Sequence, residues 1–277
     1  KKELSKRGYV FHSDTDTEVL VNLIEDVQKQ EKVKLGKAVQ IALNQVVGAY
    51  AIAVFDVDKP DEIVVISAHY DHVGVKDGEI YNGADDDGSG TVALMEMAAA
   101  FQKAKNEGNG PKRSILILHV TGEEHGLHGS RYYSENPLFP LKNTVADVNI
   151  DMIGRRDDFH KDSNNYVYVI GSDYLSTDLY NICESVNQQY IKLAIDYKYN
   201  DKKDPNRFYY RSDHYNFAKH SIPVIFYFSG VHEDYHQPTD TVEKIDFEKL
   251  ESVTRLIFLV TWKLANAEER PVVNKLK

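Results

Sequence analysis

Residues 62–72 read Glu-Ile-Val-Val-Ile-Ser-Ala-His-Tyr-Asp-His, so an apolar, β-branched run gives way to polar residues within one step. A run without alternation is typical of a parallel strand that is buried on both faces. Comparable runs occupy residues 114–120, 145–151 and 223–229, and each ends in or precedes polar residues. Ligands of open α/β sheets bind outside the carboxyl ends of the strands, so these strand ends are the first candidates for a site.

Segments in which apolar residues recur at helical spacing lie between these strands. We expect helices at residues 16–30, 39–47, 88–104, 174–190 and 247–264, and strands at residues 49–55, 62–68, 114–120, 145–151, 166–171 and 223–229. Alternating strands and helices predict an α/β fold. The expected architecture is a three-layer sandwich, in which helices cover both faces of a central mixed, mostly parallel sheet.

Composition and charge exclude several classes of protein. The 277 residues are 42% hydrophobic and 27% charged, which is enough apolar material for a sizeable core. With 33 basic and 43 acidic side chains the formal net charge is −10, which argues against nucleic acid as a partner. No apolar run approaches the roughly 20 residues that a membrane span needs, so we expect a soluble protein. The single cysteine, Cys183, excludes an internal disulfide and a thiolate zinc site.

Short polar motifs follow the predicted strands. They are His-Tyr-Asp-His at 69–72 with Gly-Ala-Asp-Asp-Asp-Gly-Ser-Gly at 83–90, Thr-Gly-Glu-Glu-His-Gly at 121–126, Asn-Ile-Asp-Met at 149–152 and Asp-Tyr-His-Gln-Pro at 234–238. Each has a simpler explanation by itself: a buried core histidine, aspartates that cap the next helix, or an exposed acidic face. Several carboxylates around one cleft repel one another unless cations compensate. Mixed imidazole and carboxylate groups suit zinc-like ions, so the motifs together predict a metal site.

Residues 232–236 read His-Glu-Asp-Tyr-His and match the His-Glu-x-x-His pattern of zinc proteases. The mechanism of those proteases needs both histidines on one face of a helix. Gly230 before the pattern, Pro238 after it and the buried strand that leads into it all oppose a long helix. We therefore keep His236 alone as a candidate ligand.

Taken in order, the motifs resemble those of co-catalytic double-zinc aminopeptidases of the bacterial leucyl aminopeptidase type. The resemblance covers roughly residues 59–277 and includes Arg-Ser-Asp-His at 211–214 and Tyr-His-Gln-Pro-Thr-Asp-Thr at 235–241. It implies a catalytic domain that removes N-terminal residues from peptide or aminoacyl substrates with two zinc ions. Cobalt or manganese can replace zinc at such sites, because hard and borderline ions accept this ligand set.

The resemblance implies a ligand for each position of the two-metal site. One zinc ion would be held by His69 and Asp151, and the second by Glu124 and His236. Asp86 would bridge both ions, and the peptide bond that follows it would be cis, as is typical of this family. Such a pair of cations activates water and polarises the scissile carbonyl.

Further residues receive roles from the same resemblance. Glu123 would move the proton from water to the leaving amine, and Tyr235 would stabilise the oxyanion. Arg211 would bind substrate, and Asp71 would orient the His69 ring. The simpler alternatives are an exposed Glu123, a Tyr235 that packs in the wall and an Arg211 paired with an aspartate, Asp213. The remaining histidines of the motifs are interpreted as structural or as supports of ligands: His72, His125, His128 and His214.

The first part of the chain is not similar to that family. Residues 8–20 and 48–55 resemble an internal piece of the glutaminase domain of glucosamine-fructose-6-phosphate aminotransferase. Asp16 matches its glutamine-binding aspartate, but the piece contains neither the cysteine nucleophile nor the Asn-Gly oxyanion element, so glutaminase activity is not expected. We expect residues 1–58 to form a helical segment and a strand that pack on the main core, with a junction near residues 56–63.

Three alternatives to an aminopeptidase stay open. A glutaminyl-peptide cyclotransferase resembles the same family but uses one zinc, and it usually carries Trp where this chain has Tyr235. A carboxypeptidase or aminoacylase shares the two-metal plan, because the pocket walls set the polarity of cleavage. A binding module that keeps the fold is opposed by the intact ligand set. Relatives are often secreted or periplasmic, so the resemblance implies export, which the first residues neither support nor refute. The sequence leaves the compartment and the oligomeric state open.

Overall fold

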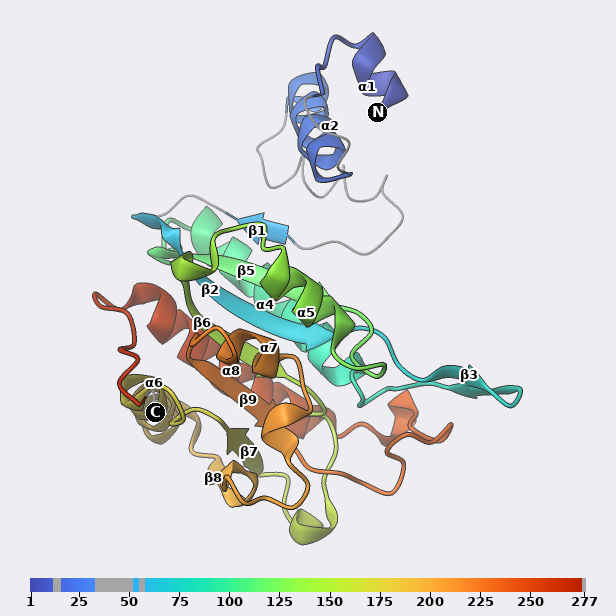
Figure 1. Ribbon diagram of the computed structural model, residues 1–277, viewed down its shortest axis with the longest axis vertical. Helices are drawn as coiled ribbons and strands as arrows, with labels where there is room; N and C mark the ends of the chain where they lie inside the picture. Colours follow the sequence, from blue (N-terminus) through green and yellow to red (C-terminus); the bar gives the residue numbers. More distant parts are fainter. Residues whose placement is uncertain (12–15, 33–51, 55–57, 276–277) are drawn as a thin grey trace. The chain divides into compact units, whose positions relative to one another are not determined.

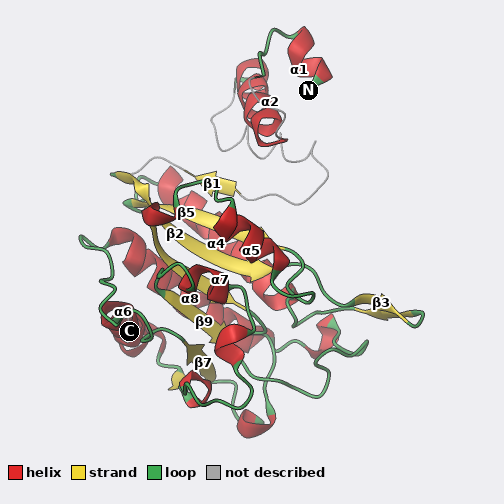
Figure 2. Cartoon of the chain, in the orientation of Figure 1, coloured by secondary structure: helices red, strands yellow, loops and turns green. Residues whose placement is uncertain are grey.

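The computed structural model describes residues 1–11, 16–32, 52–54 and 58–275, and Figures 1 and 2 trace its elements. The chain divides into two compact units, Lys1–Ala49 and Tyr50–Lys277. Within the described residues no helix has the length and apolar character that crossing a bilayer requires. The site developed below belongs to the larger unit.

The described part of the smaller unit contains the helices α1 (Lys2–Lys6) and α2 (Asp16–Glu31). Helix α2 confirms the helix predicted at residues 16–30. Arg7 forms an ion pair with the buried carboxylate of Asp26 in α2, and Gln30 donates to the same carboxylate at 3.1 Å. The helix predicted at residues 39–47 lies outside the described residues.

The larger unit is built on one sheet. Its described strands follow the order β1-β5-β2-β6-β9-β7-β8. Their bounds are β1 (Ile52–Val54), β2 (Lys59–His69), β5 (Arg113–Val120), β6 (Thr144–Ile150), β7 (Tyr166–Ile170), β8 (Ala194–Asp196) and β9 (Val224–Phe228). The neighbours β5, β2, β6 and β9 run parallel, and so do β7 and β8, whereas β1 is antiparallel to β5 and β7 is antiparallel to β9. The predicted mixed, mostly parallel sheet is confirmed.

Helices cover both faces of this sheet. They are α4 (Gly88–Asn106), α5 (His128–Glu135), α6 (Thr177–Val186), α7 (His214–Ala218) and α8 (Phe247–Asn266). Helices α4, α6 and α8 share one apolar cluster with the β2 side chains Val64 and Ile66. Helices α5 and α7 share another cluster with Ile63 and Val65, which point to the opposite face because side chains alternate along a strand. The predicted three-layer sandwich is therefore confirmed (Figure 1).

Several local features differ from the expectations. Strands β1 and β2 are consecutive in the described chain but not adjacent in the sheet, because β5 lies between them. The predicted helix at 174–190 is shorter: α6 ends at Val186 and a π-helical turn follows over Asn187–Ile191. Strands β3 (Gly74–Lys76) and β4 (Glu79–Tyr81) form a separate hairpin. Short 3₁₀ turns occupy Leu141–Asn143, Asp158–His160, Lys198–Asn200, Phe208–Tyr210 and Val242–Lys244.

The topology brings four loops to one edge of the sheet. The adjacent parallel strands β2, β5, β6 and β9 end at His69, Val120, Ile150 and Phe228. Because the carboxyl ends of parallel strands meet at the same edge, the polar motifs that follow them converge there.

Candidate metal centre and active site

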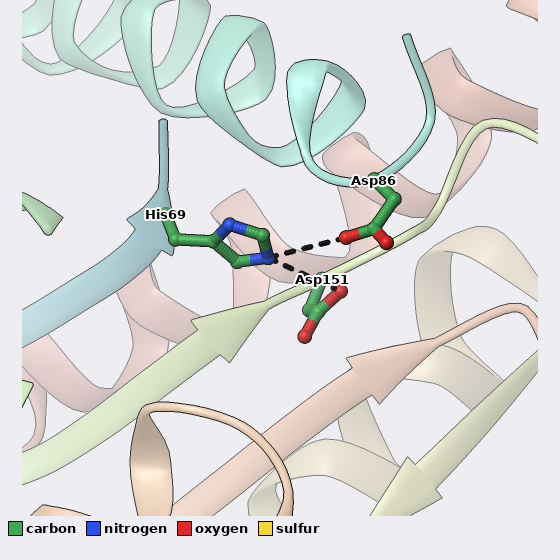
Figure 3. A group of neighbouring side chains, drawn as sticks. All are labelled: His69, Asp86 and Asp151. Carbon is green, nitrogen blue, oxygen red and sulfur yellow. Dashed lines mark ion pairs between the residues drawn. The ribbon is translucent and has the colours of Figure 1, made fainter. Parts of the chain in front are cut away.

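The first cluster consists of His69, Asp86 and Asp151, which come from the end of β2, the turn before α4 and the end of β6 (Figure 3). The Nε2 atom of His69 lies 3.3 Å from Oδ1 of Asp86 and 3.7 Å from Oδ1 of Asp151. The other ring nitrogen, Nδ1, lies 3.0 Å from the carbonyl oxygen of Asp71, to which it donates. A proton held on Nδ1 leaves Nε2 free to bind a cation.

A second cluster lies on the other oxygen of Asp86. Nε2 of His236 is 3.1 Å from Oδ2 of Asp86 and 2.9 Å from Oε2 of Glu124. The ring of His72 also enters this cluster, with Nδ1 2.9 Å from Oε1 of Glu124. Asp86 thus presents one carboxylate oxygen to each cluster. The structure brings together all five residues that the resemblance implies as ligands. It adds His72, for which the motifs predict a structural role or the support of a ligand.

The polar atoms of the two clusters fit zinc-like cations. Across the described residues, the atoms without a hydrogen-bond partner include Nε2 of His69, Oδ2 of Asp86, Oε1 of Glu124 and both ring nitrogens of His72. Buried polar atoms of this kind are costly unless something binds them. Imidazole nitrogens and carboxylate oxygens are the groups that zinc accepts in proteins without cysteine ligands.

The electrostatics of the clusters also favour positive charge. Burial opposes a proton on His69, but Asp151 and Asp86 raise its pKa well above the usual range. Hydrogen bonding to Asp86 and Glu124 raises the pKa of His236 to about 10. Both pKa values are raised by the high density of carboxylates. Cations bound at the same positions would compensate this negative charge as protons do.

The three consecutive aspartates at 85–87 have three different surroundings. Asp86 faces both clusters, and the Asp86–Asp87 peptide bond is cis, as the resemblance implies. Asp87 caps α4 by accepting from the Gly90 amide at 2.9 Å, so the helix-capping alternative holds for this residue. Asp85 accepts from the Gly154 amide at 2.6 Å and from Nε2 of His232 at 3.1 Å. The Asp85 carboxylate therefore joins the loops that carry Asp86, Asp151 and His236.

Residues 233–236 form a turn and His232 precedes it without helical structure, so the rejection of the His-Glu-x-x-His interpretation is confirmed. His232 supports Asp85, whereas His236 faces the second cluster. Asp234 fastens the loop by accepting from Thr239 and Lys244 at 2.5 Å each and from Arg155 at 2.9 Å.

Glu123 and Asp71 lie beside the clusters. The Glu123 amide donates to Oδ1 of Asp71 at 3.3 Å, and the same oxygen lies 3.7 Å from Nδ1 of His69. The Glu123 side chain belongs to neither cluster. Burial, reinforced by the negative charge of Asp151, raises the pKa of Glu123 to about 10. A carboxyl group with a strongly raised pKa next to candidate metal ligands is a candidate for proton transfer.

A cavity of about 30 Å³ lies against the clusters and Glu123. Its apolar wall is formed by Met152, Phe208, Phe226, Phe228 and Val231. At its rim the Tyr235 ring stacks on His236 with centroids 3.8 Å apart. Arg211 donates to the Tyr235 hydroxyl at 3.1 Å, while Asp213 accepts from Ser130 at 2.5 Å, so Arg211 has a partner other than Asp213.

Comparison with known proteins assigns a family to this arrangement. A model of peptidase family M28 matches residues 51–261, which contain both clusters, Glu123 and Tyr235. The chain belongs to peptidase family M28. The M28 match covers every described strand of the main sheet and begins two residues after Ala49, where the smaller unit ends.

Similar proteins include aminopeptidases and a cyclase. A probable leucine aminopeptidase of Trichophyton verrucosum is 29% identical over 218 residues, which are 76% of this chain and 56% of that protein. The chain therefore spans about half the length of this relative. The structure of BSAP, a zinc aminopeptidase from Bacillus subtilis, has a TM-score of 0.61 at 22% identity and covers 82% of this chain and 52% of its own. A glutaminyl cyclase of Bacteroides thetaiotaomicron has a TM-score of 0.58 at 18% identity. The match covers 90% of this chain and 98% of the cyclase chain.

The N-terminal residues are similar to a different family. A glutamine amidotransferase domain model matches residues 1–91, so it overlaps the M28 match over residues 51–91. Glutamine–fructose-6-phosphate aminotransferase of Bacteroides thetaiotaomicron is 56% identical over 64 residues, which are 23% of this chain and 10% of that enzyme. The predicted similarity of the N-terminal segment to this enzyme is confirmed, and the junction near residues 56–63 stays a prediction.

Proposed function

We propose that the larger unit is a zinc-dependent aminopeptidase that removes N-terminal residues from peptides with two zinc ions. The observation that carries the proposal is the pair of clusters with ligand groups for cations, which share Asp86 and adjoin the partly buried Glu123. Membership of family M28 and the aminopeptidase relatives support the reaction class.

In this proposal His69 and Asp151 would hold one zinc ion, Glu124 and His236 would hold the other, and Asp86 would be shared between them. When bound, the ions supply Lewis acidity that activates water and polarises the scissile carbonyl. Thr91 and Asp71 hold His69 in position. Thr91 donates to the His69 carbonyl at 2.9 Å, and the Asp71 carbonyl accepts a hydrogen bond from Nδ1 of the ring. These contacts keep Nε2 of His69 aimed at Asp86 and Asp151.

Glu123 acts as the general base and then as the general acid. Its carboxylate takes a proton from the attacking water and delivers it to the leaving amine. In the protein without cations the carboxyl is protonated at neutral pH, because burial and Asp151 raise its pKa. Positive charge in the neighbouring clusters lowers this pKa, so base function requires loaded clusters.

Tyr235 stabilises the oxyanion, with Arg211 as its positioning residue. The hydroxyl can donate to an oxygen that develops negative charge, because Arg211 occupies its acceptor side at 3.1 Å. The carboxylates around the cavity attract the free α-amino group of a substrate. The apolar wall at Met152 and Phe226 accepts the side chain of the N-terminal residue.

Glutaminyl cyclisation is the second candidate, favoured by the coverage of 90% and 98% between this chain and the Bacteroides thetaiotaomicron cyclase. Two observations oppose it. The structure has a second cluster of possible metal ligands, whereas glutaminyl-peptide cyclotransferases use one zinc. The residue before His236 is Tyr235, and the sole tryptophan of the chain, Trp262, lies in α8.

A substrate panel tests the proposal. Aminoacyl anilides with a free amine, the same anilides with an acetylated amine and an N-terminal glutaminyl peptide are incubated with the zinc-loaded protein. We expect hydrolysis of the free-amine anilides alone. Preferred cleavage of the acetylated anilides would indicate an aminoacylase-like polarity, and cyclisation of the glutaminyl peptide would indicate the transferase; either result contradicts the proposal.

A further inference from the structure

His72 is a largely buried imidazole whose hydrogen-bonding capacity is not satisfied. Its side chain is 8% exposed, and among the described residues Nε2 has no hydrogen-bonding partner. Nδ1 lies at ion-pair distance from Glu124 but forms no well-oriented hydrogen bond with it. Leaving a buried donor or acceptor unsatisfied costs about 1–3 kcal/mol. A purely structural histidine would avoid this cost, so the ring requires another explanation.

The ring is aimed at the second cluster. Nδ1 of His72 lies 2.9 Å from Oε1 of Glu124 and 3.8 Å from Oδ2 of Asp86. His236 approaches the same two carboxylates through the other oxygen of Glu124, at 2.9 Å. The two imidazole rings meet edge to face, with centroids 5.8 Å apart. Glu124 therefore lies between two imidazoles, each of which faces one of its oxygens.

The backbone makes room for His72 in this position. Gly83 has a φ of +62°, and a Cβ atom at this residue would lie 2.4 Å from Cγ of His72. Glycine is thus needed for the backbone conformation and for the ring that packs against it.

We propose that His72 is a fourth protein ligand of the second cation, beside Asp86, Glu124 and His236. This assignment rests on the proposed function, because it takes a zinc ion as the occupant of the second cluster. It makes the two positions unequal: the second has two imidazoles and four protein ligands, whereas the first has His69, Asp151 and the shared Asp86. Four protein ligands are typical of closed zinc sites, and three leave a position open for water or substrate.

The inequality predicts the order of zinc binding. The second cluster takes up zinc first and more tightly, because it offers more protein ligands and the imidazoles that zinc favours. The first cluster fills later and exchanges more readily. Substrate then approaches the first position, whose coordination is incomplete.

The test measures zinc affinity, not turnover. Metal-free wild type and His72→Ala are titrated with zinc against a chromophoric chelator, with His125→Ala as a matched control, because this exposed imidazole follows Glu124 directly. We expect wild type and His125→Ala to bind one tight and one weaker zinc. His72→Ala should bind the tighter zinc at least tenfold more weakly, and His236→Ala should lose the same equivalent. Unchanged affinities in His72→Ala, or a wild type that binds no zinc, would overturn the assignment.

If His72→Ala does not fold, a second variant that is probed by absorption spectroscopy tests the assignment instead. His72→Cys places a thiolate donor at the same position, and cobalt bound to it should give a thiolate-to-metal charge-transfer absorption. The background is low, because the single native cysteine, Cys183, is buried and its pKa is raised to about 12. Cobalt-loaded wild type and His125→Cys should lack the band. A folded, cobalt-loaded His72→Cys without the band would contradict the assignment.

The result is separable from that of the proposed function. A tight zinc that depends on His72, in a protein that cleaves no free-amine anilide, would leave the assignment standing and refute the aminopeptidase. If the protein cleaves anilides but its zinc affinities do not change in His72→Ala, the aminopeptidase function would stand and the assignment of His72 as a ligand would be refuted.

Discussion

The carboxylate of Asp85 joins three loops of the site, and its removal gives a prediction whose size follows from the structure. Asp85 is fully buried and accepts from the Gly154 amide at 2.6 Å and from Nε2 of His232 at 3.1 Å. The Asp234 amide donates to Nδ1 of His232 at 3.3 Å, which assigns the ring proton to Nε2. Both partners of the Asp85 side chain are thus donors.

The conservative variant Asp85→Asn keeps the volume but loses one acceptor. The amide oxygen can still accept from the backbone of Gly154, and the amide nitrogen then faces the Nε2–H of His232. Leaving one buried donor unsatisfied costs about 1–3 kcal/mol, and Asp85→Ala, which leaves two, costs about 2–6 kcal/mol. Zinc affinity should fall about 10- to 100-fold in Asp85→Asn, as is typical when partners behind metal ligands are changed.

Urea unfolding followed by Trp262 fluorescence measures the free energy of unfolding of the larger unit, because the sole tryptophan lies in α8. Asp158→Asn is the control, since this exposed aspartate lies outside the network, and it should stay within about 0.5 kcal/mol of wild type. An Asp85→Asn protein with wild-type unfolding midpoint and zinc affinity would refute the claim that Asp85 holds the loops together.

Three further predictions concern single residues. Glu123→Gln should lower kcat by about 10²- to 10⁴-fold with zinc content unchanged, because Glu123 belongs to neither cluster; activity near wild type would refute its role as base. Tyr235→Phe should lower kcat by about 10²- to 10³-fold, and a change confined to KM would instead indicate wall packing. Burial lowers the pKa of Lys249 to about 7 from 10.5, so the unfolded chain binds more protons between these values and wild-type stability rises with pH across this window. Lys249→Met should lack this rise, which is about 3 kcal/mol between pH 7 and 9.5, in urea unfolding at these two pH values; parallel pH profiles would show that the lysine does not titrate in the folded protein.

The sheet could be predicted because its strands carry their signal locally. Residues 63–66, 115–118 and 224–228 are continuous apolar runs, and the ends of their strands identify the edge where the site forms. Pairing is not local, so the position of β5 between β1 and β2 could not be inferred from order along the chain. Helix α5 has the sequence His-Gly-Ser-Arg-Tyr-Tyr-Ser-Glu, whose apolar spacing is too sparse to predict a helix.

The candidate site shows a similar division. Motif order identified the residues that face one another in the two clusters, but it could not separate the tasks of three consecutive aspartates. Asp85, Asp86 and Asp87 differ through their partners elsewhere in the chain. These are Gly154, His69 and Met152, which adjacency in sequence does not reveal. The position of His72 depends on the space left at Gly83, eleven residues later. The His-x-x-His spacing at 69–72 was the available signal for it.

Zinc dependence of turnover tests whether both clusters are needed for catalysis. The metal-free protein is titrated with zinc while hydrolysis of a free-amine leucyl anilide and bound zinc per chain are measured in the same samples. A two-zinc site predicts no hydrolysis without metal, little at the first equivalent and a plateau at the second. Hydrolysis that survives chelation, or full activity at one zinc per chain, would contradict the two-zinc site.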